Sequence, residues 1–540
     1  MKHATYTLFL AALLCVGCDK FFNTNPKDIY NAEDYIGTQS EIYSGFLGVI
    51  TKMQAVGDHA IFLTDTRADY LEPTDNAPQE LREVYSYEHR QGNAYADPRG
   101  FYDVIISCND YMQKARAYRD ANPEVVDADH YRGLVSSALR VKAWAYFMLA
   151  KIYGQAIYFD EPLTEYKSMN DYPILDLDQL IAKCKQLLEV GVDGIDGSYV
   201  INWAAIINPS DPNNASLIHW GFMTPDYAGL LGEICLWTGD YQKTIDLVWP
   251  ALNAAFAKTS EQWSLSDWWR GKYAAMFSDV ISTQSKFIIS AIIYNYDNNQ
   301  TNRLIDYFEN VYPCKYYLRP SEYGVERYRL QPRSDGTEGD TRRGGRLTST
   351  RNGERVMRRF LDESVRPAYR NDVHINIFRP HDYHLMLIEA FNHVKHWDEA
   401  ESIMNRGVGQ RWGGQAIMWD VYGGDATWGS NWSGSKPNLG VRYANDLDSY
   451  DLPRYDDLSV TDDEKIRAYD EAILNEILLE FPCEGKVYPA MIRFARRYGN
   501  DYAHFIADKI VPKYPEAMQA TVRAKILAGE YFVKWDLRTE

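Results

Sequence analysis

Residues 131–154 of this 540-residue chain, YRGLVSSALRVKAWAYFMLAKIYG, decide its fold class. Apolar residues recur there with the spacing of an α-helix, and the only charges are Arg132, Arg140, Lys142 and Lys151. This pattern predicts a helix that is packed on most of its circumference. Gly154 is expected to end it, because glycine readily adopts the left-handed conformation of a helix cap. The stretch therefore predicts an interior helix among closely packed helices.

Two further stretches have the form of tetratricopeptide hairpins. Residues 229–252 read GLLGEICLWTGDYQKTIDLVWPAL, with a turn at 238–240 between two helical patterns. Residues 385–408, LMLIEAFNHVKHWDEAESIMNRGV, are a degenerate copy that places Trp397 opposite Tyr241. Helices are also expected at 32–53, 101–117 and 175–192. Together they predict a mostly α fold: a tetratricopeptide-like stack of helical hairpins with long irregular loops and a little β-structure.

The N-terminus predicts export and lipid anchorage. Lys2 precedes an apolar run over residues 8–16, too short to span a membrane, and a small residue stands directly before Cys18. We expect residues 1–17 to be a lipoprotein signal peptide, Cys18 to carry the lipid, and residues 18–35 to be a tether. The alternative is an ordinary secretory signal. No other apolar run is long enough to span a membrane.

Charge and cysteine content exclude several classes of function. The formal net charge of −18 argues against binding to a nucleic-acid backbone. The five cysteines after the signal peptide are odd in number and far apart, which argues against a disulfide framework and favours small buried hydrophobes. Beyond Cys18 the sequence contains no CxxC, HExxH, GxSxG, phosphate-binding loop or dinucleotide fingerprint, so we expect no cofactor, no metal and no catalytic centre.

Four motifs in order along the chain resemble those of the SusD/RagB family of nutrient-binding lipoproteins. They are FYDVIISCNDYMQKA (101–115), the segment 138–154 with Ala143, Tyr146, Phe147, Leu149, Tyr153 and Gly154 in matching places, FRPHDYHLMLIEAFNHV (378–394), and AILNEILLEFPCEGKVYPAMIRFARR (472–497). The resemblance covers nearly the whole chain. It implies one SusD-like domain over residues 36–540, with an N-terminal part of about 36–260 that carries helical repeats and a C-terminal RagB/SusD part of about 261–540.

The same resemblance implies a function. Similar proteins sit at the surface of the outer membrane as a lid on a SusC-like TonB-dependent transporter, and deliver oligosaccharides or peptides to it without catalysis. Two other classes stay open. A helical glycoside hydrolase would need two carboxylates about 5–10 Å apart over a sugar groove. A pure tetratricopeptide scaffold would bind a protein partner and no small ligand.

Two groups of residues allow a catalytic or metal interpretation that we consider the weaker one. His381, Asp382 and His384 lack metal-binding spacing, and a helix entering the repeat stack already accounts for them. Glu476, Glu480 and Glu484 are spaced for one face of a helix, provided that Pro482 does not break it. Like charges at this spacing disfavour one another unless they are paired. We therefore expect structural ion pairs, with Arg493, Arg496 and Arg497 as candidate partners.

Aromatic residues in the loops are the predicted ligand contacts, because flat rings stack on the apolar face of a pyranose or on peptide side chains. Trp428 and Trp432 are the first choice, and the other candidates are Trp419, Tyr70, Tyr316 and Tyr317. Tryptophan in Gly/Asn-rich loops with few charges favours a glycan over a peptide.

A basic segment stands out in this acidic chain. Residues 341–360, TRRGGRLTSTRNGERVMRRF, hold seven arginines against the single acid Glu354. Arginine is well suited to planar, two-pronged contact with carboxylates at interfaces. We predict that Arg342, Arg343 and Arg346 contact acidic loops of the transporter, with a ligand carboxylate as the lesser option and a solvated loop as the alternative without function.

Overall fold

A computed structural model gives the structure of the protein. It describes residues 36–163, 171–211, 221–258, 263, 265, 275–278, 287–342, 347–361, 367–405, 411–412, 415–416, 440–530 and 532–538. In this part of the chain helices dominate, and each sheet has two antiparallel strands. The predicted mostly α fold with a little β-structure is confirmed.

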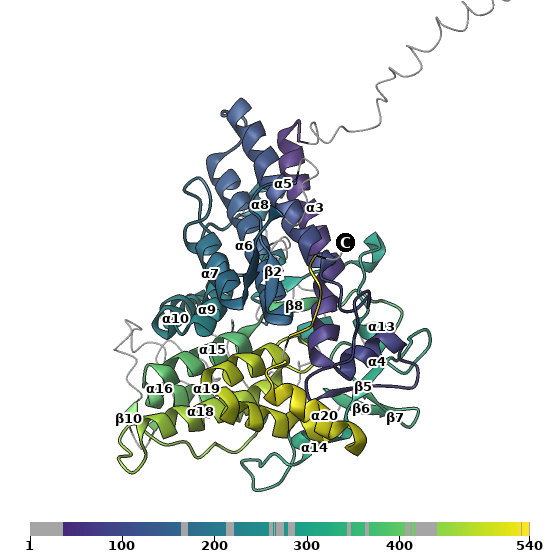
Figure 1. Ribbon diagram of the computed structural model, residues 1–540. Coiled ribbons are helices and arrows are strands. Elements are labelled where there is room, and N and C mark those ends of the chain that lie inside the picture. The colour runs from purple at the N-terminus through teal and green to yellow at the C-terminus, as the bar shows by residue number, and fades with distance from the viewer. Residues whose placement is uncertain are drawn as a thin grey trace, which may run out of the picture.

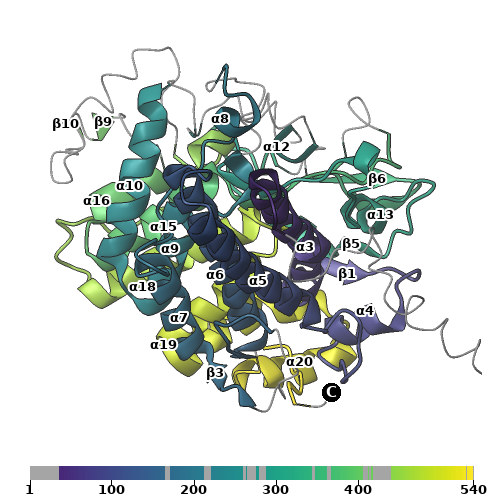
Figure 2. The same ribbon diagram turned by 90° about the horizontal axis from the view of Figure 1, so that it is seen from above.

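The first group of helices occupies the N-terminal half and lies side by side in Figures 1 and 2. It consists of α3 (Gln39–Asp65), α5 (Arg99–Ala121), α6 (Ala128–Tyr153), α7 (Leu177–Glu189), α9 (Tyr227–Thr238) and α10 (Tyr241–Lys258). Every residue of α6 from Gly133 to Tyr153 is buried, since α5 and α7 pack against it. Gly154 caps it with φ of 70°. The predicted interior helix and its glycine cap are therefore confirmed.

The first helix differs from its prediction. It begins at residue 39, where the Thr38 side chain accepts the backbone N–H of Glu41, and continues to Asp65 instead of ending near residue 53. Its second half is buried almost without interruption. Gly57, Asp58 and His59 interrupt the apolar pattern, but Asp58 is buried in an ion pair with Arg303, which is why the sequence pattern placed the end too early.

The second group of helices comes from the C-terminal half and lies below the first in Figure 1. It consists of α15 (Pro380–His393), α16 (Trp397–Met404), α18 (Asp462–Glu480), α19 (Val487–Ile510) and α20 (Glu516–Leu527). The two predicted hairpins are α9–α10 and α15–α16, and they pack on each other through α10 and α15. At this contact the ring of Tyr241 stacks on His393, with ring centroids 4.2 Å apart.

Between the two groups, the long loops are organised by paired short strands. The pairs are β1 (Leu71–Pro73) with β5 (Leu318–Pro320), β2 (Gln155–Ile157) with β3 (Ile174–Asp176), β4 (Ser290–Ile292) with β8 (Ile375–Phe378), β6 (Thr348–Arg351) with β7 (Glu354–Met357), and β9 (Arg411–Trp412) with β10 (Gln415–Ala416). The short helices are α4 (Gln79–Tyr85), α8 (Trp203–Ile207), α12 (Ala275–Ser278), η4 (Tyr296–Asn298), α13 (Leu304–Phe308), α14 (Glu322–Arg329), η6 (Tyr443–Asn445) and η7 (Val511–Lys513). In Figure 2 α13, β5 and β6 form a projection at one side of the helices.

One hydrophobic cluster runs through both helix groups, from Ile36 to Val533. Of the five cysteines after the signal peptide, Cys108, Cys184, Cys235 and Cys483 are buried and Cys314 is partly buried, all as free thiols. They are the small buried hydrophobes that the sequence predicted. Across the ranges given above, no helix is long and apolar enough to cross a membrane.

Candidate functional site

Several predicted site residues lie outside the described residues. They are Cys18, the three loop tryptophans Trp419, Trp428 and Trp432, and the arginines Arg343 and Arg346. Their assignments stay predictions.

Two of the predicted ligand contacts are corrected by burial. Tyr70 is 1% exposed, its ring packs against Tyr328 and its hydroxyl bonds to Thr348. Tyr316 is 5% exposed, and its hydroxyl donates to the backbone carbonyl of Arg355 at 2.6 Å. Both tyrosines adjoin the β1–β5 pair and hold the loops together, so neither ring is available for stacking on a ligand.

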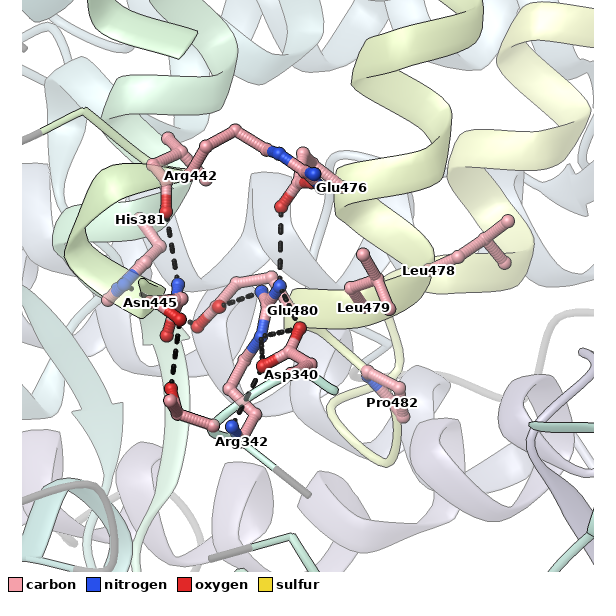
Figure 3. Close-up of polar contacts among 12 residues, drawn as sticks. Asp340, Arg342, His381, Arg442, Asn445, Glu476, Leu478, Leu479, Glu480 and Pro482 are labelled. Carbon is pink, nitrogen blue, oxygen red and sulfur yellow. Dashed lines mark hydrogen bonds and ion pairs between the residues drawn. The ribbon is translucent and has the colours of Figure 1, made fainter. Parts of the chain in front are cut away.

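The assignment of Arg342 to a partner surface is also wrong. Its side chain is fully buried, and its guanidinium donates to the carboxylates of Asp340 (2.6 Å) and Glu480 (2.7 Å) and lies 3.5 Å from that of Glu476. Figure 3 shows these contacts converging below the end of α18. A buried cation is held by buried anions, so Arg342 cannot meet another protein.

The three glutamates do form ion pairs, as expected, but with other arginines. Glu476 accepts from Arg442 at 2.7 Å, and Glu480 accepts from Arg379 at 2.7 Å. Burial alone would raise the pKa of Glu480, but Arg379 and then Arg342 hold it below its ordinary value. We call Asp340, Arg342, Arg359, Arg379, Arg442, Glu476, Glu480 and Glu484 the Arg–Glu cluster. It joins distant loops to α18 and is fully internal, so it serves the fold.

The predicted partners of the glutamates bind elsewhere. Arg493 and Arg497 both pair with Glu389, each at 2.6 Å, and Arg496 pairs with Asp178. The reason is that α18 ends at Glu480, and a turn of Pro482 to Gly485 then points Glu484 back toward Arg359 and Arg379. The arginines of α19 therefore pair with Glu389 of α15 and Asp178 of α7 instead of with Glu476, Glu480 and Glu484.

The histidines of α15 are structural as well. Asp382 accepts from the Lys486 ammonium at 2.7 Å, and the Nδ1 of His384 contacts the carbonyl of Pro380 at 2.7 Å. Within the described ranges no group of three histidine, cysteine or carboxylate side chains is placed to hold a metal ion.

The structure brings together a different set of aromatic residues on two loops, 294–317 and 367–373. Tyr296 is 36% exposed and Tyr369 is 52% exposed, and their ring centroids are 5.9 Å apart. The guanidinium of Arg370 lies 5.3 Å from the ring centroid of Tyr296. It also pairs with Asp297 at 3.2 Å and with Asp372 at 3.5 Å. The two exposed rings therefore lie beside one guanidinium and two carboxylates, which can donate and accept hydrogen bonds.

Backbone contacts fix these two loops relative to each other. The Asp372 carboxylate accepts the backbone N–H of Tyr296 at 3.1 Å, and the N–H of Asn302 donates to the carbonyl of Asn371 at 2.8 Å. The side chain of Asn295 caps η4, which carries Tyr296. The tyrosine pair is therefore held in place before any ligand arrives.

Further along the same loop, Tyr317 is partly exposed, alone among the predicted ligand contacts that the structure describes. Its ring lies 4.7 Å from that of Tyr307, beside Lys315. Tyr312 is 94% exposed. We call Tyr296, Tyr369 and Arg370 the tyrosine loop cluster. One feature of the sequence indicates this region: the segment 284–350 is longer than an ordinary connection between helices, and loops of such length are usually functional.

Arg303 supports the loop from beneath. Its guanidinium donates to the buried Asp58 at 2.5 Å and lies 5.7 Å from the ring centroid of Tyr307. Burial would lower the pKa of Arg303, yet Asp58 holds it above its ordinary value. This pair connects α3 to α13, so the cluster rests on the helical core.

Comparison with known proteins identifies the fold. No protein-family model and no curated protein matches the chain. Solved structures do. A SusD superfamily protein from Bacteroides vulgatus matches with a TM-score of 0.60 and 14% identity, over 91% of this chain and 96% of that one. A SusD superfamily protein from Bacteroides thetaiotaomicron matches with 0.59 and 15%, over 93% and 95%. Surface glycan-binding protein A from Bacteroides fluxus matches with 0.57 and 14%, over 89% and 94%.

Proposed function

We propose that this chain, which has the SusD-like fold, is a surface-exposed nutrient-binding lipoprotein that captures oligosaccharides and passes them to a partner TonB-dependent outer-membrane transporter. Lipid on Cys18 would anchor it to the outer membrane, and the tether of residues 18–35 would let the body stand away from the bilayer. The tyrosine loop cluster would hold the glycan.

The observation that carries this proposal is the exposed pair of Tyr296 and Tyr369 beside Arg370. An exposed ring can stack on the apolar face of a pyranose, while neighbouring polar groups bond to its hydroxyls. Asp297 and Asp372 more than offset the positive charge of Arg370, so the group does not attract an anionic ligand. The likeness to a protein named for glycan binding supports the same ligand class.

The tryptophans of the segment 406–458, which is rich in Gly, Asn, Asp and Trp, remain part of the proposal. Trp428 and Trp432 would add stacking surface to the site, with Trp419 as a third contributor. Peptides are the alternative ligand in the same role, since tyrosine rings and an arginine also suit peptide side chains and carboxylates.

The test is calorimetric titration of the full chain with neutral oligosaccharides and with mixed peptides. Replacing Tyr296 and Tyr369 together by alanine should weaken glycan binding about tenfold or more, because both stacking faces are removed. Tyr199→Ala, at a tyrosine of similar exposure outside the cluster, is the matched control. Wild-type affinity in the double variant would refute the assigned site, and tight binding of peptides alone would refute the ligand class.

The same samples decide between binding and hydrolysis. Incubation of the protein with each glycan should leave the number of reducing ends unchanged. New reducing ends would instead support a helical glycoside hydrolase.

A further inference from the structure

The C-terminal segment 532–538 lies against the beginning of α5 and borders a hollow of about 810 Å³. In Figure 1 this yellow segment rises from the second helix group and ends beside the first, at the label C. Ligand pockets for small molecules typically measure about 300–1,000 Å³. The hollow shares no residue with the tyrosine loop cluster.

Its wall is apolar and partly aromatic. Trp535 and Leu537 come from the C-terminal segment, and Tyr102 and Ile106 come from α5. All four are half-buried, so each side chain keeps part of its surface open. Tyr102 is fixed in place, because its hydroxyl accepts the backbone N–H of Ile157 at 2.8 Å.

The rim carries charges of both signs. Arg99 and Arg538 are exposed and positive, Asp103 and Asp536 are exposed and negative, and the Arg99 guanidinium is already paired with the Asp97 carboxylate. No excess of positive charge is left to attract an anion. Its many hydrogen-bonding groups fit a ligand that has hydroxyls as well as apolar faces.

The C-terminal segment is held rigidly enough to form such a wall. Asp536 and Gln91 exchange two bonds, from the Asp536 N–H to the Gln91 side chain (3.0 Å) and from that side chain to the Asp536 carbonyl (3.2 Å). The N–H of Val533 donates to the carbonyl of Ile152 at the end of α6, at 2.8 Å. Because the segment is already fixed, binding of a ligand loses little conformational entropy of the C-terminal segment.

A second hollow, of about 350 Å³, continues past the first. It shares Gln91, Trp535 and Asp536 with the larger one and reaches Tyr153 and Gln155. Trp535 therefore stands where the two hollows meet. Two adjoining hollows that share one indole in their lining suit an extended ligand of several similar units.

We propose that this pair of hollows is a second saccharide site, which takes a short neutral oligosaccharide with one ring against Trp535. The chemistry of wall and rim carries the inference, so it does not depend on the tyrosine loop cluster. A chain with two such sites would hold a long glycan at two points and gain avidity.

Titration of the full chain with maltotriose, cellotriose, xylotriose and mannotriose tests the site. For at least one of these trisaccharides, Trp535→Ala should raise the Kd of one binding event about tenfold. The double variant Tyr296→Ala with Tyr369→Ala should leave that Kd unchanged. Ile106→Trp adds a large ring at this half-buried wall position and should abolish the same binding. Thermal unfolding confirms that each variant is folded.

Three outcomes would overturn the inference: no binding that responds to Ile106→Trp, binding lost only in the tyrosine variants, or a peptide in place of every sugar. The first and second leave the proposed function intact, whereas the third also refutes its ligand class. If no binding responds to Tyr296→Ala with Tyr369→Ala while binding that depends on Trp535 is present, the site of the proposed function is refuted and the second saccharide site stands.

Discussion

Arg342 shows how one buried side chain organises the long loops. It sits in a loop, yet it pairs with Asp340 beside it and with Glu480 at the end of α18, 138 residues away. Removing one partner of a buried ion pair leaves an uncompensated buried charge, which costs about 3–5 kcal/mol. The loop that carries the basic segment is thereby joined to the second helix group.

Arg342→Met should therefore lower the free energy of unfolding by about 3–5 kcal/mol, as measured by urea denaturation. Arg342→Lys should lower it less, because it keeps the charge but loses the two-pronged geometry. Arg329→Gln, at a half-exposed helix position, is the control and should change little. Equal effects of Arg342→Met and Arg329→Gln would contradict this role.

Asp65, at the end of α3, gives a prediction about pH. Its buried carboxylate accepts the backbone N–H groups of Cys483 (2.8 Å) and Gly485 (2.7 Å). Burial raises its pKa from the ordinary 3.8 to about 7. Because the folded pKa is the higher one, Asp65 contributes stability that is fully present below pH 3.8 and is lost as the pH rises through about 7.

Asp65→Asn cannot ionise, so its free energy of unfolding should fall less with rising pH than that of the wild type. The difference in free energy of unfolding, wild type minus variant, should be about 3 kcal/mol smaller at about pH 8 than at about pH 4.5. Urea denaturation at both pH values measures it. The exposed Asp456→Asn is the control, and a pH-independent difference for Asp65→Asn would disprove the raised pKa.

At the scale of elements, Gly154 ends the central helix and also receives the C-terminal segment. Its φ is 70°, and a Cβ placed on it would lie 2.5 Å from the ring of Phe532. Gly194 has a similar φ of 76° but open space around its Cα. The two glycines separate the cost of backbone conformation from the cost of packing.

Gly194→Ala should cost about 1 kcal/mol, which is the strain of an alanine in the left-handed region. Gly154→Ala should cost about 2–4 kcal/mol, because it also displaces Phe532 from the end of α6. Thermal unfolding of the two variants measures the difference. Equal costs would mean that the C-terminal segment shifts freely, which would also weaken the case for a preformed wall beside Trp535.

At the scale of the whole molecule, the charge distribution sets the expectation for a partner. The chain carries a net charge of −18, and several arginines of the basic segment pair internally: Arg342 with Asp340, Arg351 with Glu309, Arg355 with Glu72 and Arg359 with Glu484. We retain the proposal of a transporter contact for Arg343 and Arg346 alone.

Arg343→Gln with Arg346→Gln should reduce the amount of transporter that co-purifies at low ionic strength. The gap from the wild type should narrow as salt rises, because salt screens exposed charges. The matched control is Arg132→Gln with Arg329→Gln, two half-exposed arginines on helices. An unchanged complex together with weaker glycan binding would move these arginines to the ligand site.

Local patterns in the sequence determined the helical elements and their fold class. The periodicity of residues 131–154, the cap at Gly154 and the two hairpins depend on residues within one or two turns of each other. For the same reason, motifs on single helices were enough to indicate the SusD-like fold. The burial of the cysteines followed from their apolar character. The internal pairing of the glutamates followed from their charge, since burial penalises lone charged groups.

The tertiary structure alone decided which loop residues are open to a ligand. Tyr70 and Tyr316 have the same composition around them as exposed aromatics, but the β1–β5 pairing, across 247 residues between Glu72 and Arg319, buries them. Tyr296 meets Tyr369 only because Asp372 and Asn371 bind the loop that carries it. Exposure and ion-pair choice in loops depend on long-range contacts, which no local pattern of residues contains.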